Sequence, residues 1–127
     1  MMNHSEDQDN FSKLLELSPV IIIIHGDGII TYVNPYTASL LTGGDRSKMI
    51  GQPLSRFVHP DYHDMVTRNL AIRGKSQDTI QYLKQRLISH DGREFYVRGS
   101  STPIIYHGAP SILAIGENVT EANELMA

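Results

Sequence analysis

The stretch GDGIITYVNPYTASLLTG, residues 26–43, decides the fold. Its first three residues favour a tight turn, because glycine tolerates a positive φ angle. The segments on either side, 20–25 and 29–33, are rich in β-branched residues and predict the two strands of a hairpin. Asn34, which a proline follows, then predicts the N-cap of a helix. A hairpin that runs directly into a helix indicates a domain of mixed α and β structure.

The rest of the chain extends this pattern in both directions. Downstream, turn residues and hydrophobic periodicity predict two short helical pieces in 45–58. A longer helix should follow, which begins at His59-Pro60-Asp61 with Asp61 as its cap and ends at Gly74. Three strands are predicted over 79–89, 95–106 and 111–119. Upstream, they predict a disordered polar tail over 1–9 and a short helix over 10–18, with Asn10 as its N-cap and Pro19 at its end. Residues 10–120 are therefore expected to form a single α+β domain with one antiparallel sheet, and residues 121–127 to begin a linker helix.

The composition fits one globular domain. The chain has 127 residues, 40% of them apolar, which is enough to bury a core. Its formal net charge of −3 gives no reason to expect nucleic acid or an anionic membrane as a partner. The longest apolar run, 20–24, is far too short to span a bilayer, and the acidic N-terminus does not resemble a secretion signal. We therefore expect a cytoplasmic domain.

Missing residue types and motifs exclude several functions. The chain has no cysteine, which excludes disulfides, cysteine nucleophiles and cysteine-linked chromophores. The sequence contains no phosphate-binding glycine loop, nucleophile elbow or kinase signature. We expect a regulatory domain rather than an enzyme, with any catalytic activity in an attached effector.

Four strings, in this order, resemble the PAS domain family. Residues 26–43 are similar to the family's first hairpin and the helix after it. The helical middle is SKMIGQPLSRFVHPDYHDMV (47–66), with the Ile-Gly-x-Pro and His-Pro-Asp signatures, and the long central hairpin is HDGREFYVRGSSTPI (90–104). The string IGENVTEANEL (115–125) resembles the family's closing strand and its Asp-Ile-Thr-Glu exit motif, with Asn118 in place of the Asp and Val119 in place of the Ile. The resemblance covers roughly residues 10–122, and the order of these motifs makes it specific.

The resemblance implies a five-stranded antiparallel sheet, short helices that enclose a pocket over one face, and an N-terminal helical cap. It also implies a sensory module that binds a small ligand or mediates dimerisation, and that relays the signal to a C-terminal effector. The expected effector is a sensor histidine kinase of a bacterial two-component system. The alternatives are a diguanylate cyclase or phosphodiesterase as the effector, or a ligand-free dimerisation module with a filled core.

The ligand pocket that the resemblance implies would lie where inward-facing side chains meet, and strand alternation helps to select them. The expected lining is Tyr32, Asn34, Leu40, Ile50, Phe57, Met65, Val66, Leu70, Phe95, Val97, Gly99 and Ser101, with Tyr82 and Tyr96 as further polar contacts. Gly99 and Ser101 are small, and they leave room either for a ligand or for close packing. The apolar members of the set would equally fill a core without a ligand.

Haem is the metal cofactor for which the resemblance offers a ligand. Oxygen-sensing relatives carry an iron-ligating His near the position of His63, followed by Asp, as in this chain. Many relatives without haem are also polar at this position, so haem is not favoured. His59 lies four residues before His63, but Pro60 places it outside the helix and no third ligand is evident, so we expect no metal site. Flavin bound without an adduct is a further alternative, although the chain has no Trp and so lacks one stacking partner that such sites often use; the expectation is a domain without a cofactor.

The two ends of the domain carry the residues predicted to act in dimerisation and relay. The helix predicted at 10–18 offers apolar side chains to the sheet or to a second copy: Phe11, Leu14, Leu15 and Leu17. The resemblance implies that the exit segment, with Asn118, Thr120 and Glu121, passes strain from the sheet into a C-terminal helix. A homodimer joined to an effector is the expected assembly.

Overall fold

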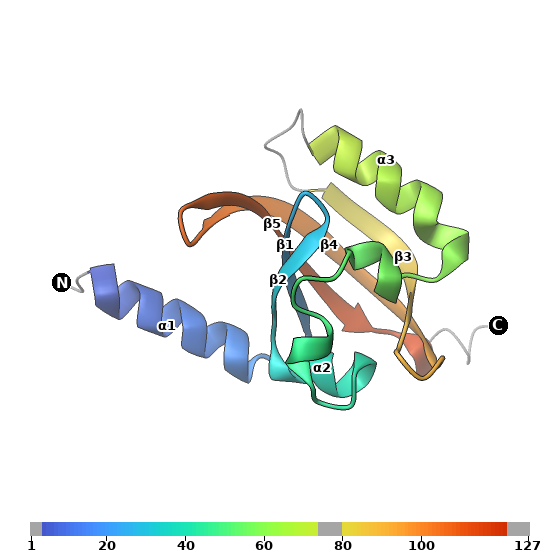
Figure 1. Ribbon diagram of the computed structural model, residues 1–127, viewed down its shortest axis with the longest axis horizontal. Helices are drawn as coiled ribbons and strands as arrows, with labels where there is room; N and C mark the ends of the chain where they lie inside the picture. The colour runs from blue at the N-terminus through green and yellow to red at the C-terminus, as the bar shows by residue number, and fades with distance from the viewer. Residues whose placement is uncertain (1–3, 74–79, 122–127) are drawn as a thin grey trace.

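The computed structural model describes residues 4–73 and 80–121, with side chains over 7–68 and 84–121. Five strands form one antiparallel sheet in the spatial order β2-β1-β5-β4-β3 (Figure 1). The strands are β1 (Ile21–Gly26), β2 (Ile29–Val33), β3 (Ile80–Ile88), β4 (Glu94–Tyr106) and β5 (Ala109–Asn118). The helices are α1 (His4–Leu17), α2 (Pro35–Leu41) and α3 (His63–Arg73), and the short 3-10 helices are η1 (Arg46–Lys48), η2 (Leu54–Phe57) and η3 (Pro60–Tyr62). The predicted α+β class and five-stranded antiparallel sheet are confirmed.

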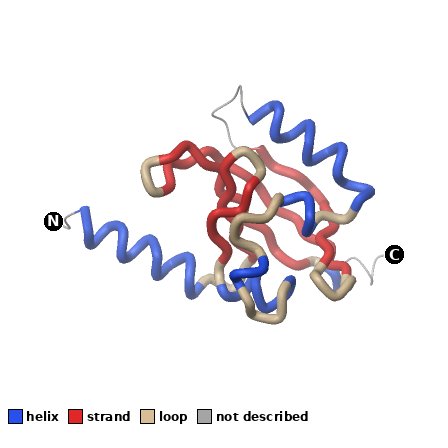
Figure 2. The backbone as a smooth tube through the Cα atoms, in the orientation of Figure 1, coloured by secondary structure: helices blue, strands red, loops and turns tan. Residues whose placement is uncertain are grey.

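The N-terminal helix is longer than predicted. It begins at His4, so the prediction of a disordered tail is wrong for residues 4–9, and Asn10 lies inside the helix instead of capping it. Asp7 lies near the start of the helix, where negative charge interacts favourably with the helix dipole. The helix ends at Leu17, two residues before Pro19, as expected. Figures 1 and 2 show α1 extending away from the sheet.

The first hairpin forms where it was predicted, with one irregularity in β2. Ile24 pairs with Tyr32 and His25 pairs with Ile30, so Thr31 is an extra residue that bulges out of the ladder. Strand β1 itself stays in regular register with β5. Because successive residues of a strand face opposite sides, His25 and Ile30 face the helical layer and Tyr32 faces the other side of the sheet.

The helical layer follows the predicted starts and stops with one exception. Asn34 caps α2, and its side chain accepts a hydrogen bond from the backbone N–H of Thr37. The cap of η3, which leads into α3, is His59 and not Asp61: the His59 ring accepts the backbone N–H of Asp61. The prediction was wrong because a histidine ring before Pro60 reaches the same amide that an Asp side chain would bind. Gly74 lies outside the described residues, whereas the exit helix begins at Thr120.

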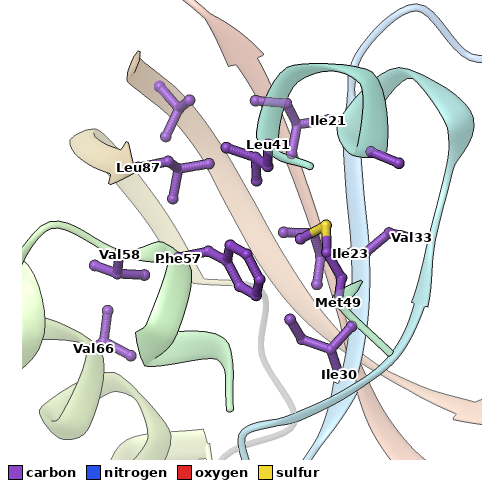
Figure 3. Packing of buried hydrophobic residues seen from close by; sticks show 12 residues of the cluster. Ile21, Ile23, Ile30, Val33, Leu41, Met49, Phe57, Val58, Val66 and Leu87 are labelled. Atoms are coloured by element: carbon purple, nitrogen blue, oxygen red, sulfur yellow. The ribbon is translucent and has the colours of Figure 1, made fainter. Parts of the chain in front are cut away.

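The two faces of the sheet carry separate apolar clusters. The inner cluster lies between the sheet and the helical layer and includes Ile21, Ile23, Ile30, Val33, Ala38, Leu41, Met49, Phe57, Val58, Val66, Leu87 and Val97 (Figure 3). The outer cluster lies on the opposite face, where Leu15 of α1 packs against Ile22 and Ile24, with Val20, Tyr32, Ile104, Tyr106 and Leu113 around them. Thus β1 is buried on both faces, as predicted.

Candidate functional site

Part of the predicted pocket lining does come together in the inner cluster. Phe57, Val66 and Val97 are buried there, and Leu40 and Phe95 pack against them while partly buried. Figure 3 shows the Phe57 ring in the middle of this cluster, among side chains from both layers. Met65 and Ser101 are half-buried, and Leu70 and Tyr82 lie outside the residues whose side chains are described. Five apolar members of the set, Leu40, Phe57, Val66, Phe95 and Val97, therefore belong to the domain core or pack against it.

Two predicted pocket residues lie elsewhere. Tyr32 belongs to the outer cluster, because the bulge at Thr31 places it opposite Ile24. Ile50 is 40% exposed, because its neighbour Met49, with no exposed surface, takes the inward position at the end of η1. These two positions in the predicted lining are wrong.

Gly99 leaves space for the protein's own backbone. A Cβ atom on Gly99 would lie only 2.0 Å from the carbonyl oxygen of Ile115. Gly99 also pairs directly with Gly116, so two glycines let β4 and β5 approach each other closely. Of the two roles that the sequence left open for Gly99, the structure supports close packing.

Asn34 is fully buried and joins three segments of the chain. Its Oδ1 accepts hydrogen bonds from the backbone N–H of Thr37 at 3.1 Å and from the Thr37 hydroxyl at 2.5 Å. Its Nδ2 donates to the carbonyl of Val20 at 2.9 Å and to that of Ser18 at 3.2 Å. With both ends of the amide engaged, Asn34 fixes the link from α1 into β1 to the start of α2. We correct its predicted role from ligand contact to structural support.

A polar contact among Glu16, Tyr32 and Arg46, called here the latch, attaches α1 to the domain. The Glu16 carboxylate accepts a hydrogen bond from the Tyr32 hydroxyl and another from Arg46 Nη2, each at 2.5 Å. Arg46 belongs to η1, and Tyr32 to the edge strand β2. The hydrogen bond from Arg46 lowers the pKa of Glu16 below its usual value, while burial, followed by the bond to Glu16, raises the pKa of Tyr32. This latch, Glu16–Tyr32–Arg46, connects the N-terminal helix to the helical layer.

His25 is an unusual core residue. It is only 3% exposed, and its Nδ1 has no hydrogen-bond partner among the described residues. Burial lowers the pKa of His25 to about 4, because the charged imidazolium is poorly solvated there. His25 is therefore neutral near pH 7, and it is the described histidine most strongly shifted by its surroundings.

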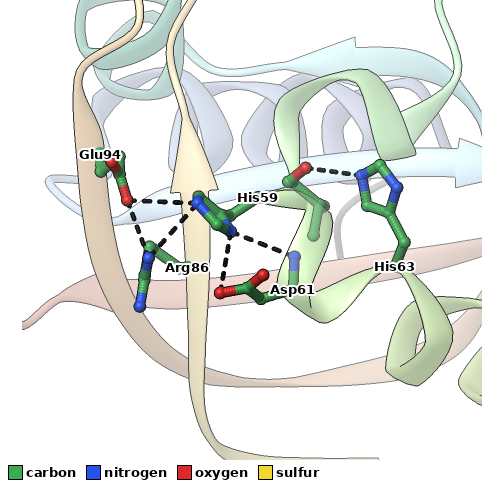
Figure 4. A network of polar contacts seen from close by, with 6 residues as sticks. His59, Asp61, His63, Arg86 and Glu94 are labelled. Atoms are coloured by element: carbon green, nitrogen blue, oxygen red, sulfur yellow. Dashed lines mark hydrogen bonds and ion pairs between the residues drawn. The ribbon is translucent and has the colours of Figure 1, made fainter.

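His63, the candidate haem ligand, already has a partner. Its Nε2 lies 2.8 Å from the carbonyl oxygen of Val58, so this nitrogen carries the proton and donates to that oxygen (Figure 4). Iron would need an unprotonated ring nitrogen, and ligation through Nε2 would break this bond. Haem ligation by His63 would therefore require the other ring nitrogen, Nδ1. Within residues 4–73 and 80–121, the structure assembles no cluster of metal-binding side chains and no helix long and apolar enough to cross a membrane.

His59 lies at the centre of a polar network between η3 and the sheet (Figure 4). Its Nδ1 is 3.1 Å from the backbone nitrogen of Asp61 and 3.7 Å from the Asp61 carboxylate. Its Nε2 is 3.4 Å from Arg86 Nη1 and 3.6 Å from the Glu94 carboxylate. Arg86 and Glu94 also pair with each other at 3.0 Å. The His59 backbone N–H donates to the carbonyl of Arg86, which holds η3 against the edge strand β3.

The exit segment is bound to the neighbouring strand. The backbone N–H of Tyr96 donates to the Thr120 hydroxyl at 3.0 Å, and its carbonyl accepts the N–H of Val119 at 2.8 Å. The Asn118 side chain accepts from both the N–H and the hydroxyl of Thr120. Asn118 and Thr120, which were predicted as relay residues, thus fix the start of the exit helix on Tyr96. Glu121 is exposed.

The predicted dimer residues separate into two groups. Leu15 is 7% exposed and packs on its own sheet, so it is not available to a second copy. Leu14 and Leu17 are 71% and 82% exposed, and Phe11 is 41% exposed.

Sequence reasoning missed Glu16, Arg46 and Arg86, whose partners are distant in the chain and leave no local pattern.

Comparisons with known proteins agree with this fold. The sporulation kinase A of Bacillus subtilis (strain 168) is 28% identical over 98 residues, which cover 77% of this chain and 16% of that kinase. The chain therefore spans only a small part of that relative. The PAS domain of an HTR-like protein from Haloarcula marismortui superposes with a TM-score of 0.75 at 24% identity, over 90% of this chain and 93% of that one.

A third likeness comes from a signalling protein. A domain of a sensory box sensor histidine kinase/response regulator from Geobacter sulfurreducens superposes with a TM-score of 0.74 at 19% identity, over 91% of this chain and 97% of that one. At this identity the likeness shows the fold alone. The sequence model of the PAS fold family matches residues 9–119, which is most of the chain. The protein therefore belongs to the PAS family of sensory and regulatory domains.

Proposed function

We propose that this domain works as a homodimer and passes its state through the exit helix to a C-terminal sensor histidine kinase. The observation that carries the proposal is the exposed apolar stripe on α1, formed by Phe11, Leu14 and Leu17. Leu14 and Leu17 point away from the face on which Leu15 contacts the sheet, whereas Phe11, one turn before Leu15, lies at the partly exposed edge of that face. An apolar stripe that leaves its own domain uncovered fits a second copy of the same helix.

The histidine kinase effector and the cytoplasmic location are parts of the same proposal. Similarity to the sporulation kinase supports the effector, since the chain matches a segment of a protein that is named a kinase. The position of the exit helix, which starts at Thr120 directly after the last strand, suits a connection to a following domain. Two-component signal transduction is the expected setting.

The dimer is tested with the double variant Leu14→Glu/Leu17→Glu. Analytical ultracentrifugation of the purified chain should show a dimer for the wild type and a monomer for the variant, because two buried carboxylates would repel across the interface. Ser12→Glu is the matched control, since Ser12 is exposed on the other side of α1. A monomeric wild type, or a double variant that remains a dimer, would rule out this interface.

The proposal does not require a bound cofactor. His63 donates to Val58, and bulky side chains from both layers pack around Phe57. Native mass spectrometry of the freshly purified protein tests this point. A mass equal to that of two bare polypeptides would support a filled core that serves dimerisation and relay. A mass excess of haem, flavin or a smaller metabolite would show instead that the domain senses a ligand.

A further inference from the structure

The surroundings of His59 cannot all be satisfied by one protonation state of its ring. A neutral imidazole has one acceptor nitrogen and one N–H donor. Two donors approach the ring here: the Asp61 backbone N–H at Nδ1 and Arg86 Nη1 at Nε2. A neutral ring can accept from only one of them. The hydrogen bond to Asp61 is the shorter, at 3.1 Å against 3.4 Å, so the neutral ring caps η3 and leaves Arg86 in an unfavourable contact between two donors.

Two carboxylates are positioned for the protonated ring. The Asp61 carboxylate is 3.7 Å from Nδ1 and the Glu94 carboxylate is 3.6 Å from Nε2. An imidazolium donates from both nitrogens, so each of its N–H groups would find an acceptor. The charged groups that face the ring are thus the two carboxylates, from η3 and β4, and the Arg86 guanidinium from β3. The two carboxylates are placed to accept hydrogen bonds from the ring, and the guanidinium is placed to donate one to it.

Arg86 connects this ring to the exit segment. Its guanidinium lies 5.0 Å from the centroid of the Tyr96 ring and 5.9 Å from that of Tyr62. Tyr96 is the residue whose backbone N–H and carbonyl hold Thr120 and Val119. A movement of the guanidinium away from a charged His59 would therefore change the packing of the residue that anchors the exit helix.

We propose that His59 is a switch that protonation operates. When the ring is protonated, the carboxylates of Asp61 and Glu94 replace Arg86 as its partners. The displaced Arg86 then alters the exit segment through its contact with Tyr96. Histidine is the side chain whose charge ordinarily changes between about pH 5 and 8. The last step rests on the proposed relay through the exit helix, whereas the partner exchange is independent of it.

The experiment follows backbone amide resonances by NMR from about pH 5 to pH 8. The amides of Asp61 and Thr120 should shift together along one titration curve in the wild type. His59→Asn should abolish both shifts, since an Asn side chain caps Asp61 in the same way but does not titrate in this range. His107→Asn is the matched control: His107 is exposed in a turn with φ 49, which Asn tolerates, and both shifts should remain.

A second variant tests the path to the exit helix. Arg86→Gln should keep the titration at Asp61 and lose the one at Thr120, because the group that contacts Tyr96 no longer carries a charge. The buried His25 does not interfere, since its pKa in the folded protein is about 4. Shifts that persist in His59→Asn, a flat wild type, or a Thr120 shift that persists in Arg86→Gln would each overturn the proposal.

The same titration in the Leu14→Glu/Leu17→Glu variant separates this inference from the proposed function. All contacts of His59 and Tyr96 described above lie within one chain. If the proposed dimer is wrong, the switch should still titrate unchanged in this variant. If the dimer is right and the switch is wrong, the variant is monomeric and the Thr120 amide does not shift.

Discussion

Acidification should destabilise the domain through His25. The imidazole ionises with a pKa of about 4 when it is buried in the fold, against an ordinary value of 6.5. Between these values the unfolded chain binds a proton that the folded protein does not bind, so stability rises with pH and falls on acidification. A pH of about 5 lies roughly 1.5 pH units below the ordinary pKa of histidine, so the unfolded chain is protonated at this position and the folded protein is not. The free energy of unfolding is therefore lower by about 2 kcal/mol than it is when His25 is neutral in both states.

This loss is measurable by urea unfolding at several pH values. With an m-value of about 2 kcal/mol/M, the midpoint should fall by roughly 1 M between pH 7 and pH 5. His25→Leu keeps the side chain apolar and of similar size, and it removes both the titration and the unpaired Nδ1. Its midpoint should therefore change much less over the same range. His107→Asn, at an exposed turn, should follow the wild type.

Carboxylates do not produce the same signature. Hydrogen bonds lower the pKa values of Glu16, Asp45 and Asp91 below the ordinary carboxyl range, so the stability that they contribute is lost only as the pH falls through those lowered values. The interval from pH 7 to about pH 5 is thus dominated by histidine. If His25→Leu and the wild type lose the same stability over this interval, the burial of a neutral His25 is not the cause and the reasoning fails.

Three further substitutions test the structural roles assigned above. Gly99→Ala should cost about 1–3 kcal/mol of unfolding free energy by overpacking against β5, whereas Gly26→Ala, whose new Cβ would lie 3.8 Å from its nearest neighbour, should cost clearly less in the same urea titration. Arg46→Gln should raise the pKa of Glu16 toward its ordinary value in a carboxyl NMR titration, yet change stability by only about 0.5 kcal/mol, because both partners are partly exposed. Asn34→Leu should destabilise by about 3 kcal/mol in urea unfolding, since it removes a helix cap and leaves buried carbonyls unpaired, and a loss below that of Arg46→Gln would contradict the role of Asn34.

Features that depend on neighbouring residues were predictable from the sequence. The β1–β2 turn needs positive φ at Asp27 and Gly28, and the residues themselves indicate it. Asn34 caps α2 because the cap and the capped amide are three residues apart. The sheet class follows because five segments of strand-like composition are separated by turn signals. In each of these cases the physical cause lies within a few residues of its effect.

Features that depend on distant contacts were not predictable. Tyr32 was expected to supply a polar contact to the pocket, but it faces the other side of the sheet, and nothing in the sequence marks Thr31 as a bulge. The same limit applies to Arg46 and Glu16, which are 30 residues apart in the chain. Gly99 left two roles open because the close approach of Ile115 exists only once β4 and β5 have paired.

The proposed relay requires the ends of this small domain to change while its core persists. The inner cluster is apolar, and β4 and β5 approach so closely at Gly99 that a Cβ there would lie 2.0 Å from the carbonyl oxygen of Ile115. Polar contacts beside the edge strands help to hold both terminal segments. Glu16 and Arg46 attach α1 near β2, in addition to the packing of Leu15, and Tyr96, whose ring packs against Arg86 of β3, attaches the exit segment. Partly exposed polar contacts of this kind contribute little individually and exchange partners readily, whereas disruption of a packed core costs several kcal/mol. A signal that acts on these edge contacts can therefore change α1 or the exit helix while the fold persists.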